Sequence, residues 1–384
     1  MTHEPIIVVG GGLVGLAFAC AAKESPVKVF ESHAADLNAP GDTWDARLFA
    51  LSPGTRRFLT EIGAWDKLDA RRVTAVGRMV VTGDAGGELD FTAPGGDALA
   101  WIVEGNRLLR ALGLRARELA DVLLVAPASG ESIRADAAGC ELQLKDGTVH
   151  RGAVAVAADG SGSWLREQLG VAVDCDDYEE TAFVANFECE RAHQGIARQW
   201  FGGDGILAWL PLAGRRISIV WSASVALAAE LAALGPAEFA GRVEVAGHGV
   251  LGAMRLDLPA SRFPLRRLRA RSLAMPGAVL LGDAAHTLHP LAGQGVNLGF
   301  RDAQVLAATL AARSPLERPG DLAVLRRHER ARREDIAAMS ITTHGLDRLF
   351  SAQSPVVRRM RNAGLSLADR LAPLKGALAR HAMQ

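Results

Sequence analysis

The order of apolar and polar residues predicts that the chain begins with a strand, a turn and a helix. Residues 5–9 and 27–30 are short apolar runs, and residues 13–23 between them have the composition of a buried helix. Short apolar runs bounded by turn residues are typical of buried strands. Strands that alternate with helices predict a parallel sheet with helices packed on it, so we expect an α/β fold.

The same alternation continues along the chain. We predict helices over residues 53–62, from residue 107 to about 120, from Asp302 onward and over 321–350. The apolar runs at 122–125, 154–158 and 279–281 predict further strands, and shorter strands are expected between 130 and 150. The many arginines and carboxylates of 321–350 are most simply a solvated helix face.

Two other regions have the pattern of antiparallel strands. Residues 73–81 and 88–92 flank a Gly-Asp-Ala-Gly-Gly turn and predict a hairpin. Four strands are expected between 182 and 221, with one helix over 225–240. This sheet would form the wall of a second, inserted domain. Its larger apolar residues either line a pocket or belong to a plain core: Trp200, Phe201, Trp209, Leu210 and Trp221.

Composition and charge narrow the functional classes. Lysine plus arginine and aspartate plus glutamate both number 43, so we expect no nucleic-acid partner. The four cysteines have no CxxC spacing, which favours reduced thiols in a cytoplasmic protein and no metal site. Residues 5–22 are apolar but follow no basic segment and contain a glycine-rich turn, so we do not expect a signal peptide.

Three glycine-rich turns follow the ends of predicted strands. In the first, Gly10-x-Gly12-x-x-Gly15 lies between a strand and a helix, and Glu31 ends the next strand, where a carboxylate can bind a ribose. This predicts a Rossmann-like dinucleotide site. The alternative is a tight turn that binds nothing.

The second turn contains Asp159 and Gly160, and the third begins with Gly282 and Asp283. A loop through Gly293, Gln294, Gly295, Val296 and Asn297 follows the third turn and presents backbone N–H groups that suit an anion. One ligand touched by all three turns explains them together. The alternative for Asp159 is a helix N-cap with no other role.

Three more side chains carry open alternatives. Arg47 either pairs with a pyrophosphate through its planar guanidinium or is solvated. His286 either relays a proton from the substrate hydroxyl or holds its loop by hydrogen bonds, and the same question applies to His289.

These motifs resemble those of the ubiquinone-biosynthesis hydroxylases, a branch of the group A FAD-dependent aromatic monooxygenases. The order and spacing of Gly10-x-Gly12-x-x-Gly15, Asp159-Gly160 and the run GDAAH…P…GQG.N at 282–297 are those of that family. The resemblance implies a glutathione-reductase-like FAD-binding domain over 1–72, 99–174 and 264–350. It implies an inserted antiparallel-sheet substrate domain over 73–98 and 175–263, with a C-terminal helical segment at 351–384.

The resemblance also implies roles for individual residues. FAD would meet Glu31 at its ribose, Arg47 and the first turn at its pyrophosphate, and Asp283 at its ribitol. The backbone from Gly293 to Asn297 would face the isoalloxazine ring. Asn106 is expected to contact the cofactor, and the Asp159 turn to meet both FAD and a transient NAD(P)H. His286 and Pro290 are the candidates for catalysis, Pro290 by shaping the loop beside the flavin.

The implied reaction is hydroxylation of a polyprenylated phenol or quinone precursor of ubiquinone, using NAD(P)H and O₂ through a C4a-hydroperoxyflavin. The alternatives are a monooxygenase for a small soluble aromatic and a catalytically idle flavoprotein subunit of a biosynthetic complex. Residues 355–384 hold six basic residues among leucines and valine. This segment either covers the flavin domain or contacts a partner or the inner face of the membrane.

Overall fold

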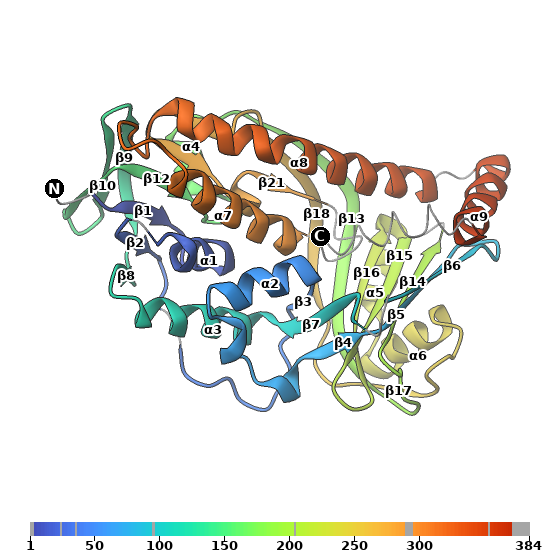
Figure 1. Ribbon diagram of the computed structural model, residues 1–384. Helices are drawn as coiled ribbons and strands as arrows, with labels where there is room; N and C mark the ends of the chain where they lie inside the picture. The colour runs from blue at the N-terminus through green and yellow to red at the C-terminus, as the bar shows by residue number, and fades with distance from the viewer. Residues whose placement is uncertain are drawn as a thin grey trace.

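The computed structural model describes residues 4–23, 25–34, 37–93, 97–202, 205–288, 295–351 and 354–370. Two large sheets lie toward opposite ends of the molecule, and the long helix α8 (Leu322–Ser351) runs along both of them (Figure 1). The fold is α/β, as the pattern of strands and helices predicts.

The first sheet has six strands in the order β19-β20-β12-β1-β2-β8. The five strands from β20 to β8 are parallel, and β19 pairs antiparallel with β20. Their bounds are β1 (Ile6–Val9), β2 (Val27–Phe30), β8 (Val122–Val125), β12 (Val154–Ala157), β19 (Ala274–Met275) and β20 (Ala278–Leu280). The sequence predicted the parallel strands because both faces of such a sheet are buried and each strand is a continuous apolar run.

Helices cover one face of this sheet and a small sheet covers the other. Ile6 and Val8 of β1 pack in a core with α1 (Leu13–Ala21), α2 (Pro53–Glu61), α3 (Gly105–Glu118) and α7 (Gly295–Ala311). Ile7 points the other way and packs with strands β9 (Gly130–Asp136) and β10 (Gly139–Leu144), which pair with β11 (Val149–Gly152). The short helix α4 (Trp164–Gln168) follows β12.

The large sheet has the order β21-β18-β13-β16-β15-β14-β5-β6, with β17 beside β13. All its pairs are antiparallel except β14 with β5. Its strands are β5 (Arg78–Thr82), β6 (Glu88–Thr92), β13 (Val173–Cys189), β14 (Ile196–Gly202), β15 (Gly205–Leu212), β16 (Arg216–Ser224), β17 (Met254–Leu256), β18 (Ser261–Ala270) and β21 (His286–Thr287).

The predicted hairpin is only partly correct. β5 and β6 pair as expected, but the strand predicted over 73–81 is interrupted at Gly77. Its first part, β4 (Thr74–Val76), instead joins β3 (Leu48–Leu51) and β7 (Ala100–Glu104) in a separate three-stranded sheet. Short 3-10 turns at η1 (Trp65–Lys67) and η2 (Ala70–Arg72) connect α2 to β4.

The helix predicted over 225–240 is two helices, α5 (Val225–Ala233) and α6 (Pro236–Ala246). Pro236 ends the first helix because proline restricts the residue before it, and it starts the second at a position where its missing N–H costs nothing. Both helices pack on the outer face of the large sheet, around Phe187 and Trp209.

Two predictions about the C-terminal third are wrong. Helix α7 begins at Gly295 and not at Asp302, so Asp302 lies in its third turn. Helix α8 is not simply a solvated face, since Arg332 is completely buried. Helix α9 (Pro355–Arg370) lies beyond the end of α8, near β6 (Figure 1). The domain boundaries stay a prediction, because strand pairing does not establish which segments fold together.

Candidate active site

A cavity of about 1160 Å³ extends from the carboxyl ends of the parallel strands to the inner face of the large sheet. This is where open α/β sheets bind their ligands. Most of the predicted cofactor-binding residues that the structure describes line it: Gly10, Gly12, Glu31, Arg47, Asn106, Asp159, Gly160, Asp283, Gly295, Val296 and Asn297. Gly15 and Gly282 do not, although both pack beside it.

The glycines of the first turn have different jobs. Gly10 has φ +106°, and a Cβ there would lie 2.3 Å from the carbonyl oxygen of Ala158. A Cβ at Gly15 would lie 2.0 Å from the carbonyl oxygen of Gly10. Both positions are therefore restricted to glycine by packing. At Gly12 a Cβ would meet no atom within 4 Å, so the N-terminus of α1 opens toward the cavity without a side-chain cap.

Glu31 closes the first turn from the end of β2. Its Oε2 accepts a hydrogen bond from the Gly11 amide at 2.8 Å, and its Oε1 accepts from the His33 amide at 3.0 Å and from Ser32 Oγ at 3.1 Å. Burial raises the pKa of Glu31, but these hydrogen bonds outweigh it and leave the pKa below its ordinary value. Glu31 is therefore an ionised acceptor at the cavity wall.

Asp159 shapes the second turn. Its carboxylate accepts hydrogen bonds from the Leu165 amide at 3.0 Å and from Ser163 Oγ. Ser163 is the N-cap of α4, so the N-cap alternative for Asp159 is wrong. Burial raises the pKa of Asp159 above its ordinary value despite these hydrogen bonds. Gly160, with φ +85°, carries the chain out of the turn.

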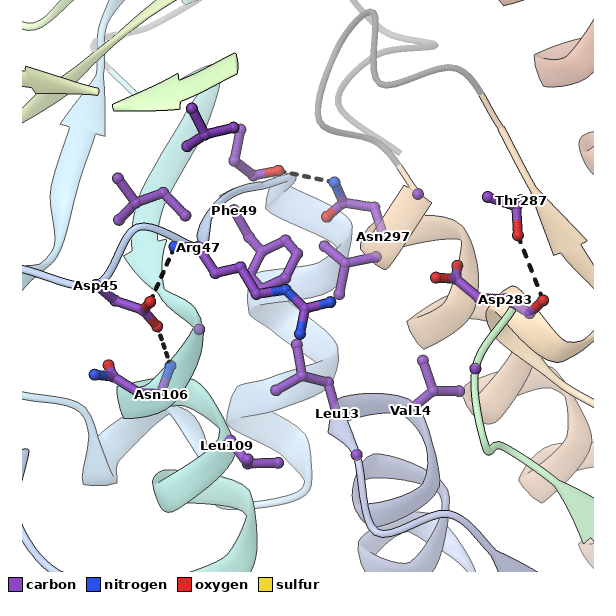
Figure 2. Close-up of a pocket in the computed structure, with 18 of the residues that line it drawn as sticks. Leu13, Val14, Asp45, Arg47, Phe49, Asn106, Leu109, Asp283, Thr287 and Asn297 are labelled. Atoms are coloured by element: carbon purple, nitrogen blue, oxygen red, sulfur yellow. Dashed lines mark hydrogen bonds between the residues drawn. The ribbon is translucent and has the colours of Figure 1, made fainter. Parts of the chain in front are cut away.

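Asp283 and Arg47 face each other across the cavity. The Asp283 side chain is accessible from the cavity but surrounded by protein, and this burial raises its pKa, while His286 and Arg47 lower it. Figure 2 shows the Arg47 side chain extended between Leu13 and Asn297, with Asp283 on the opposite wall. Within the described residues, the Arg47 guanidinium makes no hydrogen bond to the protein. The ligand-pairing role of Arg47 stays a prediction, because Arg47 is exposed and a guanidinium without a protein partner also fits a solvated side chain.

His286 lies behind the cavity and not in its lining. It is 2% exposed, and its Nε2 lies 2.6 Å from Oδ2 of Asp302. The same Oδ2 accepts from the Gly282 amide at 2.9 Å, and Oδ1 accepts from Nε of Arg332 at 2.6 Å. Burial raises the pKa of Asp302, but His286 and Arg332 hold it well below its ordinary value. This geometry supports the loop-holding alternative for His286.

The start of α7 connects two walls of the cavity. Asn297 accepts a hydrogen bond from the Ser52 amide at 2.9 Å and donates one to the carbonyl oxygen of Ala50 at 2.8 Å. Its side chain therefore fixes α7 to the end of β3, while the first turn of α7 opens to the cavity. Four residues singled out from the sequence lie outside the described ranges: His289, Pro290, Gly293 and Gln294.

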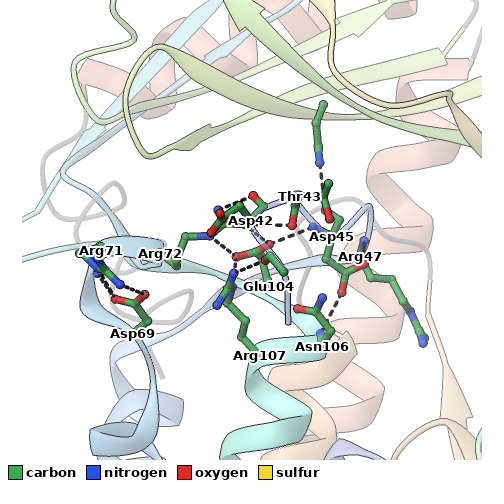
Figure 3. Close-up of polar contacts among 12 residues, drawn as sticks. Asp42, Thr43, Asp45, Arg47, Asp69, Arg71, Arg72, Glu104, Asn106 and Arg107 are labelled. Carbon is green, nitrogen blue, oxygen red and sulfur yellow. Dashed lines mark hydrogen bonds and ion pairs between the residues drawn. The ribbon is translucent and has the colours of Figure 1, made fainter. Parts of the chain in front are cut away.

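A buried carboxylate supports the Arg47 loop from behind. Glu104 is completely buried, and Arg72 binds both of its oxygens, at 2.7 and 2.8 Å. Arg107 donates to it at 2.7 Å, and the Asp45 amide at 2.9 Å (Figure 3). Sequence reasoning missed Glu104. A lone acid between an apolar run and a helix start was the only available signal.

Asp45 connects Glu104 to two predicted cofactor residues by hydrogen bonds. One of its carboxylate oxygens accepts from the Arg47 amide at 2.9 Å and the other from the Asn106 amide at 2.8 Å. The second bond places a carboxylate at the N-terminus of α3, where it is favourable. The Asn106 side chain remains exposed to the cavity.

The sheet end of the cavity is mostly apolar. Strand residues on the inner face of the large sheet line it, including Met79, Val184, Ala208, Leu210 and Val220. Of the five larger residues considered from the sequence, only Leu210 faces the cavity. Trp200, Trp209 and Trp221 pack beneath α5 and α6, and Phe201 packs against Phe350, so the plain-core alternative is correct for these four.

Known proteins are similar to this chain over nearly its whole length. The FAD binding domain family model matches residues 3–339. The chain is 36% identical over 383 residues to the ubiquinone hydroxylase UbiL of Rhodospirillum rubrum, covering 98% of this chain and 89% of that protein. It is 34% identical over 396 residues to the 3-demethoxyubiquinol 3-hydroxylase of Escherichia coli, covering all of both. The chain belongs to the family of FAD-dependent ubiquinone-biosynthesis hydroxylases.

The fold of this hydroxylase is also that of the p-nitrophenol 4-monooxygenase PnpA from Pseudomonas putida DLL-E4. The TM-score is 0.78 at 19% identity, with 99% of this chain and 98% of that one covered. The resemblance stated from the motifs is confirmed, and so is the fold class. The protein is an FAD-dependent monooxygenase.

The cavity of the hydroxylase fits FAD. Its volume of about 1160 Å³ lies above the roughly 300–1,000 Å³ of typical small-molecule sites, as a large cofactor requires. The open cradle at Gly12 and the N-terminus of α1 suit a pyrophosphate, and the ionised Glu31 suits a ribose. Arg47 adds a cation without a protein hydrogen-bond partner in the described part of the chain.

Proposed function

We propose that this chain hydroxylates the aromatic ring of a polyprenylated phenol or quinone precursor of ubiquinone, with NAD(P)H as a transient reductant and O₂ as co-substrate. The observation that carries the proposal is the single cavity that joins the glycine turns to the apolar face of the large sheet. Matching the full length of a protein named 3-demethoxyubiquinol 3-hydroxylase supports the quinone-type substrate.

The chain's own residues would bind and orient the cofactor and the substrate, and they would exclude water. Bound FAD supplies the redox and oxygen chemistry. Glu31, Arg47 and Asp283 hold the cofactor, and the N–H groups at the start of α7 stabilise negative charge on its ring. Asn106 adds a polar contact, and the Asp159 turn serves both FAD and the visiting nicotinamide. The apolar sheet wall keeps water from the reacting centre.

We propose a division of the chain that these contacts support. Segments 1–72, 99–174 and 264–350 contain the cofactor residues, and 73–98 and 175–263 contain most of the sheet wall. The segment 351–384 contains α9, which is anchored to the β5–β6 hairpin. There Asn362 Oδ1 accepts hydrogen bonds from the amides of Ala85 and Gly87, both at 3.1 Å.

We propose contact of α9 with an anionic membrane surface. Val356, Met360 and Leu367 lie on one exposed side of the helix, with Arg359 beside them, whereas Arg358 pairs with Asp84 of the hairpin turn. No helix in the described ranges is long and apolar enough to cross a bilayer. Replacing the three apolar residues by glutamine keeps the Asn362 anchor and should reduce cosedimentation with anionic liposomes. Unchanged cosedimentation would contradict this contact and leave a biosynthetic complex as the route to the substrate.

The proposed activity is tested on the purified protein. A visible flavin spectrum, followed by oxidation of NADH and NADPH with and without prenylated phenols, measures the cofactor and the reductant. Mass spectrometry should detect a product heavier by one oxygen atom. In a strain lacking this protein, an unhydroxylated quinone precursor should accumulate. Oxidation of small soluble phenols but not prenylated ones would instead support a soluble substrate.

A further inference from the structure

One side chain of the large sheet reaches the loop that carries Arg47. Asn186 lies on β13, and its Nδ2 donates a hydrogen bond to the carbonyl oxygen of Asp45 at 2.9 Å. The Asn186 backbone is held on both sides, because it pairs with Ser218 of β16 and its carbonyl oxygen accepts from the Asp257 amide at 2.8 Å. A side chain on a strand held in this way is a rigid support for the loop.

Asp45 is the point at which the sheet, the loop and the buried Glu104 meet. The Asp45 amide donates to Glu104 at 2.9 Å, and its carboxylate accepts from the amides of Arg47 at 2.9 Å and Asn106 at 2.8 Å (Figure 3). Asn186 binds the remaining polar group of Asp45, its carbonyl oxygen. A shift of Asp45 would therefore move two predicted cofactor residues with it.

The residue before Asp45 also contacts the large sheet. Trp44 packs against an apolar cluster that includes Ala197 of β14 and Leu212 of β15. Apolar packing has no preferred direction, whereas a hydrogen bond fixes the distance and angle between two groups. Trp44 therefore brings the loop to the sheet, and Asn186 sets its position there.

The amide of Asn186 is unfavourable for packing alone. The side chain is 1% exposed, and its Oδ1 has no hydrogen-bond partner among the described residues. Nδ2 and not Oδ1 faces Asp45, because a carbonyl oxygen can only accept. Burial of an unpaired acceptor costs free energy that an apolar residue of similar volume would avoid. The hydrogen bond to Asp45 is the contact that such an apolar residue could not make.

We propose that Asn186 is a positioning residue, which fixes Asp45 against the large sheet and thereby holds the Arg47 guanidinium at the cofactor. Asn186 itself does not line the cavity, so it acts through Asp45. This inference rests on the cofactor role proposed for Arg47. It links the proposed substrate wall to the loop that would bind FAD.

Fluorescence titration with FAD tests the inference in the wild-type protein, Asn186→Leu, Arg47→Ala and the double variant. We expect Asn186→Leu to weaken FAD binding about fivefold, within the range of one lost hydrogen bond. In the Arg47→Ala background the same substitution should change FAD affinity less than about twofold, because the effects of two residues that act together are not additive. A residue that only supported the fold would have the same effect in both backgrounds.

Two further variants serve as controls. Ser222→Ala should leave FAD affinity unchanged, since Ser222 is 3% exposed and lies four residues beyond Ser218 along β16, away from the loop. Asn186→Ala adds no bulk and repeats the titration if the leucine variant does not fold. The unfolding temperature of ligand-free Asn186→Leu should stay near that of the wild-type protein, because the lost hydrogen bond is offset by removal of an unpaired acceptor.

Equal weakening of FAD binding by Asn186→Leu with and without Arg47 would overturn the inference, and so would unchanged FAD affinity in Asn186→Leu. A large fall in the unfolding temperature of ligand-free Asn186→Leu would mark Asn186 as a structural residue instead. Unchanged FAD affinity in Arg47→Ala would overturn the cofactor role of Arg47 and the inference with it. A wild-type protein that binds FAD but does not hydroxylate prenylated phenols would overturn the proposed reaction alone.

Discussion

At the cofactor end of the cavity, turns and helix starts are held from behind by buried charged side chains, whereas the sheet end is held by strand pairing and an apolar core. Asp302 supports the Gly282 turn and Glu104 supports the Arg47 loop. At the other end, Ala208 and Leu210 are set by their strand β15, which pairs on both sides. A single polar substitution at the first end should therefore lower the stability of the fold, whereas a change of side-chain volume at the second should mainly change substrate binding.

The carboxylates at the cofactor end are themselves of two kinds. Asp302 accepts hydrogen bonds from three groups and its pKa is lowered, whereas Asp283 faces the cavity and its pKa is raised by burial. A carboxylate that already has its partners serves the fold. One that is buried beside a cavity without them is available to a ligand, so the two classes should separate experimentally.

The largest effect is expected from Asp302→Ala. The substitution leaves Arg332 charged and buried without its main partner and frees the Gly282 amide, and breaking a buried ion pair costs about 3–5 kcal/mol. Urea unfolding of the ligand-free protein measures it. Asp335→Ala is the control, because Asp335 also pairs with Arg332 but is 39% exposed, so its loss should cost about 1 kcal/mol or less. Equal costs for both would contradict the supporting role of Asp302.

The next largest effect is expected from His328, which should make the stability of the protein depend on pH. Its ring is completely buried beside Asp302 and Arg332, and burial lowers its pKa from 6.5 to about 4. Between these values the unfolded chain binds a proton that the folded one does not, so stability falls as the pH drops from 6.5 to about 4. At about 1.4 kcal/mol per pH unit, the total is about 3 kcal/mol.

Unfolding of His328→Met at pH 7 and pH 4.5 checks this prediction. The variant should lose less stability than the wild-type protein over that interval, since methionine does not titrate. Carboxylates with a lowered pKa that do not interact with His328, such as Glu31, contribute equally to both proteins and cancel in the comparison. Parallel pH profiles for the two proteins would show that His328 binds its proton equally in the folded and unfolded states.

The cofactor turns could be predicted from the sequence and their supports could not. Gly10 and Gly12 act within a few residues of chain, and β2 has the predicted bounds of 27–30, because local apolar runs and turn residues determine them. Asp302 contacts Gly282, twenty residues before it, and Arg332, thirty residues after it. A single aspartate within an Ala/Leu-rich helix was the only local signal of a buried network.

The length of β13 shows the same limit. Only its apolar part, 182–189, was predicted, but the strand begins at Val173. Its polar part is exposed and pairs with β18 and nearby arginines, with ion pairs such as Asp177 to Arg266. Charged residues on an exposed edge have no apolar alternation, so the strand there depends on a partner about ninety residues away.

Asp283→Ala is expected to affect stability less than Asp302→Ala does and to affect FAD affinity more. Among the described residues the Asp283 carboxylate accepts no hydrogen bond, so the ligand-free protein should keep its unfolding temperature. FAD affinity should fall at least about tenfold, the effect of one lost charge-assisted hydrogen bond. Fluorescence titration with FAD measures it, and Asp302→Ala serves as the contrasting variant. Retained FAD affinity in Asp283→Ala would refute the assignment of Asp283 to the cofactor.

The smallest effect on stability is expected at the sheet end, from Ala208→Phe. Ala208 is half-buried on the inner face of β15, opposite Val220, and its methyl group faces the cavity. The larger side chain enters existing space, so it should cost less than about 1.5 kcal/mol of folding free energy. FAD affinity should be unchanged, because the glycine turns at residues 10–15, 159–160 and 282–283 belong to other elements than this strand. The KM for a prenylated phenol should rise several-fold more than the KM for unsubstituted phenol, since the phenylalanine occupies volume that only the longer substrate needs. Equal KM changes for the two phenols would mean that the apolar face of the large sheet does not hold the substrate's hydrocarbon chain.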